Sequence, residues 1–300
     1  MDYRLTKAFY EEICVDVAIF KFKFVSLQAK LMRSVKIKDV IDALERFAPL
    51  PLQEDYDNAG LQVGLTGTEV SGALLSLDVT DSIIDEALEL GCNLIVAHHP
   101  LIFRRLSRIS DANYVEHLVM KAIKNDITIV AMHTNIDAAP GGVNFKIAEK
   151  IGLKDISFLG KTQTIMTADT EVKGGEGVIG TFVEPMAADD FILLLKRLFQ
   201  VECVQANQLL RREIRKVALC GGAGSFLLSD ALRVGADAFL TGEMHYHDYF
   251  GHDQEIQICA IGHYQSEQFT NEVFRDIIKK HCPGVACHLT RINTNPIIYF

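Results

Sequence analysis

The sequence has no long apolar run and no excess of basic residues, and each absence argues against a class of protein. No stretch reaches the ~18 apolar residues that a membrane-spanning helix needs. The formal net charge is −9, whereas a surface that binds nucleic acid is usually basic. We therefore expect that neither a membrane nor a nucleic acid is a partner of this chain.

The cysteines lack any paired spacing. The chain has seven of them, and none forms a C-x-x-C pair. An odd count without a regular spacing argues against a disulfide framework, and the missing C-x-x-C pairs argue against a zinc site built from thiolates. We expect reduced thiols and a cytoplasmic location.

The first 33 residues lack the pattern of a signal peptide. They have no basic stretch at the start, and the apolar run at residues 15–20 is interrupted by Asp16. Met32 stands directly before the first regular pattern. We expect residues 1–33 to be an extension, or the product of a misassigned upstream start, without a role in the chemistry.

From residue 37 on, the spacing of apolar residues alternates between that of helices and that of strands. It predicts helices over residues 37–47, 82–90, 114–124 and 143–151, with strands over 73–77, 94–97 and 127–132. Alternation of this kind predicts an α/β fold with a largely parallel sheet.

The second half of the chain repeats the pattern of the first. Residues 87–96 align without gaps with residues 231–240, and residues 129–132 align with residues 258–261. Internal similarity indicates a duplicated unit, although any two α/β units share the same rhythm of elements.

We therefore expect two related α/β/α sandwich units. The first spans residues 34–158, and a strand within residues 286–300 is a candidate to complete it. The second spans residues 159–285.

Two glycine-rich stretches allow more than one interpretation. Residues 173–177 are expected to form a turn before a strand at 178–183. Gly175, Gly177 and Gly180 have the spacing of a dinucleotide fingerprint, but no apolar strand precedes them and no helix follows, so we reject that function. Residues 221–224 form either a tight β–α turn or a site whose backbone N–H groups hold a substrate phosphate.

Side chains that can bind metals stand at the ends of four predicted strands. They are His98 and His99; His133 and Asp137; Glu243, His245 and His247; and His263 and Glu267. In the internal alignment the first group corresponds to the third, and the second to the fourth. Imidazoles and carboxylates gathered at strand ends suggest one metal-binding cleft.

Each group also has a simpler interpretation. His98 and His99 can both bind a metal only where the chain leaves its strand, as Pro100 favours; otherwise they form a hydrogen-bonded pair at a turn. Asp137 is either an oxygen ligand or a turn residue. Glu267 either bridges two cations with its two oxygens or complements the dipole of a helix.

The remaining candidates have open roles. His133 could bind a metal, move protons or support a ligand. Glu243, His245 and His247 could be ligands, proton carriers or contacts to a substrate.

Five motifs occur in the order seen in a known family. They are Asp57-Asn58-x-Gly60-Leu61, Ala97-His98-His99-Pro100-Leu101-Ile102-Phe103, His133-Thr134-Asn135-Ile136-Asp137, Thr241-Gly242-Glu243 and Gly262-His263-Tyr264-Gln265-Ser266-Glu267. Over about residues 34–300 the sequence resembles the NGG-interacting-factor-three-like family, also labelled GTP cyclohydrolase I type 2 homologue. Residues 1–33 lie outside this pattern.

The resemblance implies a dinuclear metal site in the cleft between the two units. Its ligands fall on His98, His99, Asp137, His263 and Glu267, with Glu267 bridging two divalent ions. Imidazoles and carboxylates suit Zn, Fe, Mn or Ni. The resemblance also implies a toroidal homohexamer.

The family label implies hydrolytic opening of the purine ring of GTP, and hence a hydrolase with a nucleotide substrate. A metal-activated water would attack the ring, and His133, Glu243 or His245 would move protons. A general metal-dependent hydrolase would use the same residues. The alternative is a non-catalytic metal-binding or protein-interaction protein with a regulatory role, so the sequence leaves open whether the chain is an enzyme.

Overall fold

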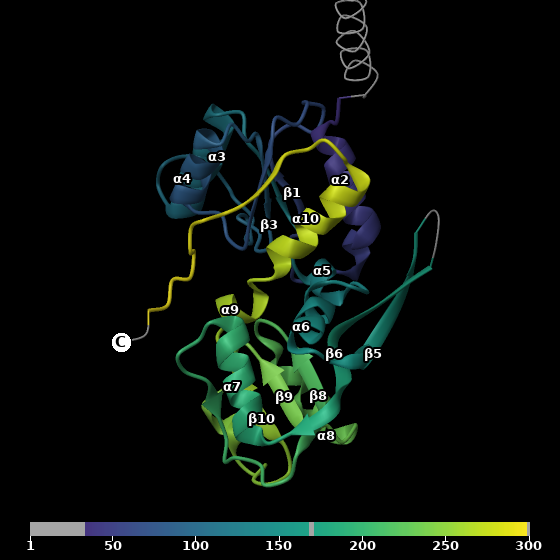
Figure 1. The fold of residues 1–300 in the computed structure, drawn as a ribbon. Coiled ribbons are helices and arrows are strands. Elements are labelled where there is room, and N and C mark those ends of the chain that lie inside the picture. The colour runs from purple at the N-terminus through teal and green to yellow at the C-terminus, as the bar shows by residue number, and fades with distance from the viewer. Residues whose placement is uncertain (1–33, 168–170, 299–300) are drawn as a thin grey trace, which may run out of the picture. The chain divides into compact units, whose positions relative to one another are not determined.

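The computed structural model describes residues 34–298 except 168–170. Our expectation for residues 1–33 therefore lies outside the described residues. The chain divides into a unit of residues 1–35 and a larger unit of residues 36–300. The larger unit contains two sheets, and Figure 1 shows helices α5, α6 and α9 between them.

The first sheet has the strand order β1-β4-β3-β2-β11. Its strands are β1 (Gly60–Val63), β2 (Ala73–Ser76), β3 (Leu94–Ala97), β4 (Thr128–Ala131) and β11 (Cys287–Leu289). β11, β2, β3 and β4 are parallel, and β1 runs antiparallel at the edge. Every residue of β2, β3 and β4 is buried, as expected for a parallel sheet covered by helices on both faces.

Four helices pack against the first sheet. They are α2 (Ile37–Phe47), α3 (Asp81–Glu89), α4 (Tyr114–Lys124) and α10 (Thr270–His281). Figure 1 shows α3 and α4 on one side of the sheet and α2 with α10 on the other. Capping residues mark the beginning of two of these helices. The side chains of Thr80 and Asn113 accept hydrogen bonds from backbone N–H groups in the first turns of α3 and α4.

The second sheet has the strand order β5-β6-β8-β9-β10-β7. Its strands are β5 (Lys154–Met166), β6 (Glu171–Met186), β7 (Gln205–Ala206), β8 (Ile214–Cys220), β9 (Ala238–Thr241) and β10 (Gln257–Ala260). The helices around it are α6 (Val143–Ile151), α7 (Ala188–Phe199) and α8 (Leu228–Arg233), with short 3-10 turns η2 (Gly224–Leu227) and η3 (Tyr246–Tyr249). A further 3-10 turn, η1 (Leu50–Leu52), follows α2.

The two sheets share one arrangement of four strands. β4, β3 and β2 are parallel neighbours, as are β10, β9 and β8, and each set has an antiparallel edge strand, β1 or β7. The aligned residues 87–96 and 231–240 fall on the corresponding pairs α3–β3 and α8–β9. The carboxyl ends of the parallel strands are in register within each sheet, so residues that follow them gather at one edge.

The glycine-rich residues 173–177 lie inside β6, so our expectation of a turn was wrong. These glycines serve close packing instead. A Cβ atom at Gly174 would lie 2.6 Å from the side chain of Leu52, and one at Gly177 would lie 2.5 Å from that of Leu227. The continuous strand also confirms that no dinucleotide fingerprint is present there.

Two expectations from composition can be compared with the described residues. None of the helices among them is long and apolar enough to cross a lipid bilayer. Their six cysteines are all free thiols, in agreement with the missing disulfide spacing.

Gly142, which precedes α6, offers a test of the packing that holds the loop after Asp137. A Cβ atom there would collide with the backbone oxygen of Ile136. We expect Gly142→Ala to lower the free energy of unfolding by about 3 kcal/mol or more, measured by urea unfolding. Gly152→Ala is the control. Gly152 ends α6 with φ +92° and open space around it, so only backbone strain of ~1 kcal/mol is expected. Equal losses in the two variants would contradict the proposed collision.

Candidate metal centre

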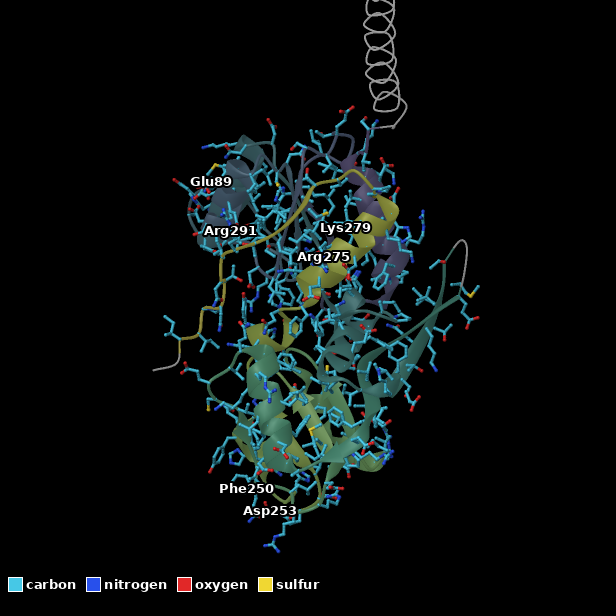
Figure 2. All side chains as sticks on the ribbon, viewed as in Figure 1. Glu89, Phe250, Asp253, Arg275, Lys279 and Arg291 are labelled. Atoms are coloured by element: carbon cyan, nitrogen blue, oxygen red, sulfur yellow. The ribbon has the colours of Figure 1, made fainter. Side chains whose placement is uncertain are left out.

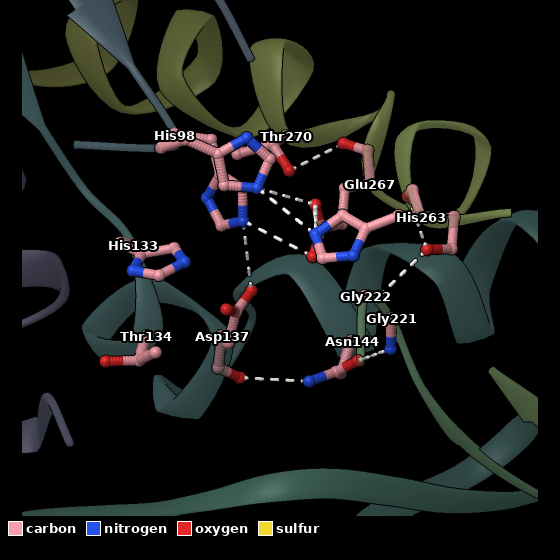
Figure 3. Close-up of polar contacts among 12 residues, drawn as sticks. His98, His133, Thr134, Asp137, Asn144, Gly221, Gly222, His263, Glu267 and Thr270 are labelled. Atoms are coloured by element: carbon pink, nitrogen blue, oxygen red, sulfur yellow. Dashed lines mark hydrogen bonds and ion pairs between the residues drawn. The ribbon is translucent and has the colours of Figure 1, made fainter. Parts of the chain in front are cut away.

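The strand ends of both sheets contribute to one cluster of side chains (Figure 3). His98 and His99 directly follow β3, and His133 follows β4. Asp137 lies in the short helix α5 (Thr134–Ala138). After β10 comes α9 (His263–Glu267), which begins and ends with the other two residues of the cluster. Their donor atoms form groups of three within 4.8 Å of one another: His98, Asp137 and Glu267; His99, His263 and Glu267; and His98, His99 and His133.

Glu267 joins two of these groups because its two oxygens face different partners. Oε1 lies 3.6 Å from Nε2 of His98, which is itself 3.8 Å from Oδ1 of Asp137. Oε2 lies 3.1 Å from Nε2 of His99 and 3.2 Å from Nε2 of His263. The Glu267 side chain is only 5% exposed, so water does little to solvate its charge.

The four imidazoles turn the same nitrogen toward the cluster. In each ring Nδ1 lies next to an oxygen atom of the protein, and Nε2 faces the other side chains of the cluster. The Nδ1 partners are the backbone oxygen of Met132 for His98 at 2.9 Å, Asp78 for His99 at 2.8 Å, Asp57 for His133 at 2.7 Å and Glu243 for His263 at 2.8 Å. An acceptor at Nδ1 places the proton there and leaves the Nε2 lone pair free to bind a metal.

Two features of the cluster indicate that it needs positive charge. Nε2 of His98 is buried and makes no hydrogen bond to any described residue. The Nε2 atoms of His99 and His263 are 3.3 Å apart, and two lone pairs cannot face each other at this distance without a proton or a cation between them. The donor set of imidazoles and carboxylates therefore fits a metal ion.

The pKa values indicate the same demand for positive charge. Burial lowers the pKa of His99, but Asp78 and Glu267 raise it to about 10. Glu267 is likewise the main cause that raises the pKa of His263 to about 9. Burial alone would raise the pKa of Glu267, but the imidazoles beside it hold that pKa well below its usual value. Protons on these imidazoles can supply the positive charge, and a divalent cation can replace those protons.

The structure brings together all five residues that the resemblance implied as ligands, and it adds His133 to the same cluster. Of the other candidates, Glu243 contacts the outer nitrogen of His263. His245 is exposed and lines a cavity of about 310 Å³ together with Glu243 and His263. His247 is also exposed, and its ring contacts those of aromatic neighbours in and after η3.

Two aspartates, Asp57 and Asp78, lie against Nδ1 of His133 and His99, and neither was among the predicted site residues. Asp57 accepts hydrogen bonds from the backbone N–H and the hydroxyl of Thr134 as well as lying against His133. Burial opposes ionisation of Asp57, but these contacts lower its pKa to about 2. Asp57 stood in the first of the five motifs, and Asp78 follows β2 as His98 follows β3, so motif membership and a strand-end position were the available signals.

The glycine turn at residues 221–224 is a tight β–α turn, and the structure does not support a phosphate site there. Three of its four N–H groups already have partners: that of Gly221 donates to Asn144 at 2.8 Å, that of Gly222 to Ser266 at 2.9 Å and that of Gly224 to Thr241 at 3.1 Å. The turn instead supports the cluster, because a Cβ atom at Gly222 would collide with Oε1 of Glu267.

A pair of carboxylates faces the cluster across a small cavity. Glu54 and Glu176 line a cavity of about 120 Å³ that Asp137, Glu267 and His133 also line. Burial and a hydrogen bond with Glu54 raise the pKa of Glu176 to about 7. The carboxyl group of Glu176 therefore keeps its proton to a higher pH than an exposed glutamate does.

This pKa predicts a pH-dependent loss of stability. The folded pKa of Glu176 lies above its usual 4.5, so its contribution to stability is fully present below pH ~4.5 and is lost as the pH rises through 7. Between pH 5 and 8 the wild-type protein should lose ~1 kcal/mol more unfolding free energy than Glu176→Gln, after allowance for partial solvent exposure. Urea unfolding at both pH values measures the difference. Glu184→Gln, an exposed position on the same strand, is the control, and equal pH dependence in all three proteins would disprove the raised pKa of Glu176.

Comparison with known proteins agrees with the fold and the motifs. Residues 35–296 match the family model described as Duf34/NIF3 (NGG1p interacting factor 3). The chain is 34% identical over 236 residues to a GTP cyclohydrolase 1 type 2 homolog of Clostridium perfringens, covering 78% of this chain and 87% of the relative. It is 33% identical to the Lactococcus lactis protein of the same name, covering 87% and 98%.

Solved structures give the same result. A hypothetical protein of Staphylococcus aureus superposes with a TM-score of 0.80 at 28% identity, covering 89% of this chain and all of that one. A Bacillus cereus protein related to NIF3 superposes with a TM-score of 0.77 at 26% identity, with the same coverage. The family model spans most of the chain, and the chain therefore belongs to the Duf34/NIF3 (NGG1p interacting factor 3) family.

Proposed function

We propose that this chain is a dinuclear metal-dependent hydrolase-like protein that acts on a nucleotide or a related substrate. The observation that carries the proposal is Glu267, a buried carboxylate whose two oxygens face two different sets of ligands. One buried carboxylate between two nitrogen and oxygen sets is the arrangement that bridges two cations in many hydrolytic sites.

Each proposed ion has its own ligands. The first position uses His98 and Asp137, the second uses His99 and His263, and Glu267 serves both. Two divalent ions held here would act as Lewis acids and lower the pKa of a water molecule, so that a nucleophile is available at neutral pH. Zn, Fe, Mn and Ni all suit these ligands.

The surrounding residues would orient the ligands and move protons. Asp57 holds the proton of His133 on Nδ1, so that Nε2, which faces His98 and His99, can accept a proton from the reacting water. Glu243 orients His263 from behind. We propose that His245, which lines the adjoining cavity, contacts a substrate and exchanges protons with it.

The names of the relatives support the nucleotide part of the proposal. Several are called GTP cyclohydrolase 1 type 2 homolog, and we propose attack of water on the purine ring of GTP as the first reaction to test.

We further propose a cytoplasmic homohexamer built from the related units 34–158 and 159–285. The pairing of β11 with β2 supports completion of the first unit by the C-terminal segment.

The second candidate is a non-catalytic protein that binds metal and a protein partner. The words "interacting factor" in the family description favour it. Purified protein loaded with each metal should be incubated with GTP, other nucleotides and phosphoesters, and the products followed by chromatography. If the metal is bound and no substrate is converted, the second candidate replaces the hydrolase.

Glu267→Gln tests the bridge itself. The amide has one oxygen in place of two charged ones, so we expect the metal content to fall from two ions to one or fewer per chain, with at least a tenfold loss of affinity for the weaker ion. Elemental analysis after dialysis against limiting metal measures this. Glu272→Gln is a matched control, because Glu272 lies five residues further on and contacts Lys150 rather than the cluster. Two ions per chain in Glu267→Gln would rule out the bridging role.

A further inference from the structure

The C-terminal segment that follows β11 contacts Asp78, whose carboxylate lies against Nδ1 of His99. Its first residue is fastened to the first sheet, because the N–H of Thr290 donates to the backbone oxygen of Leu75 at 3.0 Å. The next contacts are to α3, where the buried carboxylate of Glu86 accepts hydrogen bonds from the hydroxyl of Thr290 and the N–H of Arg291. Figure 2 shows Arg291 beside α3, near Glu89.

Thr294, further along this segment, holds the aspartate that orients a ligand. Its hydroxyl donates to Oδ2 of Asp78 at 2.6 Å, and Oδ1 of the same carboxylate accepts from Nδ1 of His99 at 2.8 Å. The Asp78 side chain is 32% exposed, and its two oxygens have different partners, Thr294 at Oδ2 and His99 at Oδ1.

Thr294 also contacts Tyr264, the residue next to His263 in the sequence. The backbone of Thr294 forms a hydrogen bond with the phenol of Tyr264, which directly follows His263. His98 has no such dependence, because its Nδ1 lies against the backbone oxygen of Met132 at the buried end of β4. Within the described part of the chain, the contacts of Thr294 therefore lie beside His99 and His263.

We propose that Thr294 is a positioning residue of the metal centre. Through Asp78 it orients His99, so that the C-terminal segment sets the affinity of the position formed by His99, His263 and Glu267. The position formed by His98, Asp137 and Glu267 does not depend on it. This inference rests on the proposed dinuclear centre.

The physical basis is the effect of a carboxylate on an imidazole ligand. A carboxylate at Nδ1 fixes the ring and makes Nε2 a stronger donor, and loss of such a partner costs about 10–100-fold in metal affinity. Thr294 acts one hydrogen bond further away, so we expect a loss near the lower end, about tenfold. Release of the segment would have the same effect without changing any ligand.

Thr294→Val keeps the shape of the side chain and removes the hydroxyl. Stepwise affinities for Co²⁺ and Zn²⁺, measured on the full chain by chelator competition and by Co²⁺ absorption spectra, should show about tenfold weaker binding of one ion and unchanged binding of the other. Thr294→Ser should restore wild-type binding. Thr290→Val is the matched control, because it removes a hydroxyl from the same segment that contacts Glu86 and not the centre; it should lower the thermal midpoint and leave both affinities unchanged.

A double-mutant cycle shows whether Thr294 acts through Asp78. Asp78→Asn should weaken the same ion more strongly, and Thr294→Val should add nothing in that background, because the path is already broken. Wild-type affinities in Thr294→Val, additive effects in the double variant, or an equal metal loss in Thr290→Val would each overturn the inference. If the wild-type protein binds two ions and Thr294→Val binds them equally well, only this inference is refuted. If the wild-type protein binds fewer than two ions, the proposed dinuclear centre is refuted as well.

Discussion

A buried carboxylate must be neutralised, and the arrangement around Glu267 follows from this constraint. An unpaired charge in the interior costs several kcal/mol, and Glu267 is almost fully buried at the end of α9. The imidazoles of His98, His99 and His263 surround its two oxygens. They can neutralise it as protonated rings or as ligands of cations, and an acceptor at each Nδ1 is compatible with both.

The ends of strands in the two sheets bring the residues that surround Glu267 together. His98 and His133 follow β3 and β4 of the first sheet, and β10 of the second leads into α9. Because parallel strands in register end at one edge, short loops after them can carry ligands into the same volume. The shared order of four strands in the two sheets explains why the candidate residues appeared as corresponding groups along the chain.

The residues behind the ligands come from distant parts of the chain. Asp57 precedes β1, Asp78 follows β2, Glu243 follows β9 and Thr294 follows β11. Each contributes one hydrogen bond to the orientation of the centre, directly or through another residue. The geometry of the cluster therefore depends on residues from many parts of the larger unit. The glycine turn at residues 221–224 contributes in another way, since it leaves the space that Glu267 occupies.

The sequence by itself determined the alternation of helices and strands, the parallel strands and the placement of His98, His99, Asp137, His263 and Glu267 at strand ends, because apolar spacing and terminating glycines are local signals. It misjudged residues 173–177, where glycine serves close packing between segments rather than a turn. Only the tertiary structure decided which oxygen faces which imidazole and which acceptor holds each ring. Thr294 and Asp78 are 216 residues apart, and no local pattern encodes a hydrogen bond that exists only after the sheet has paired β11 with β2.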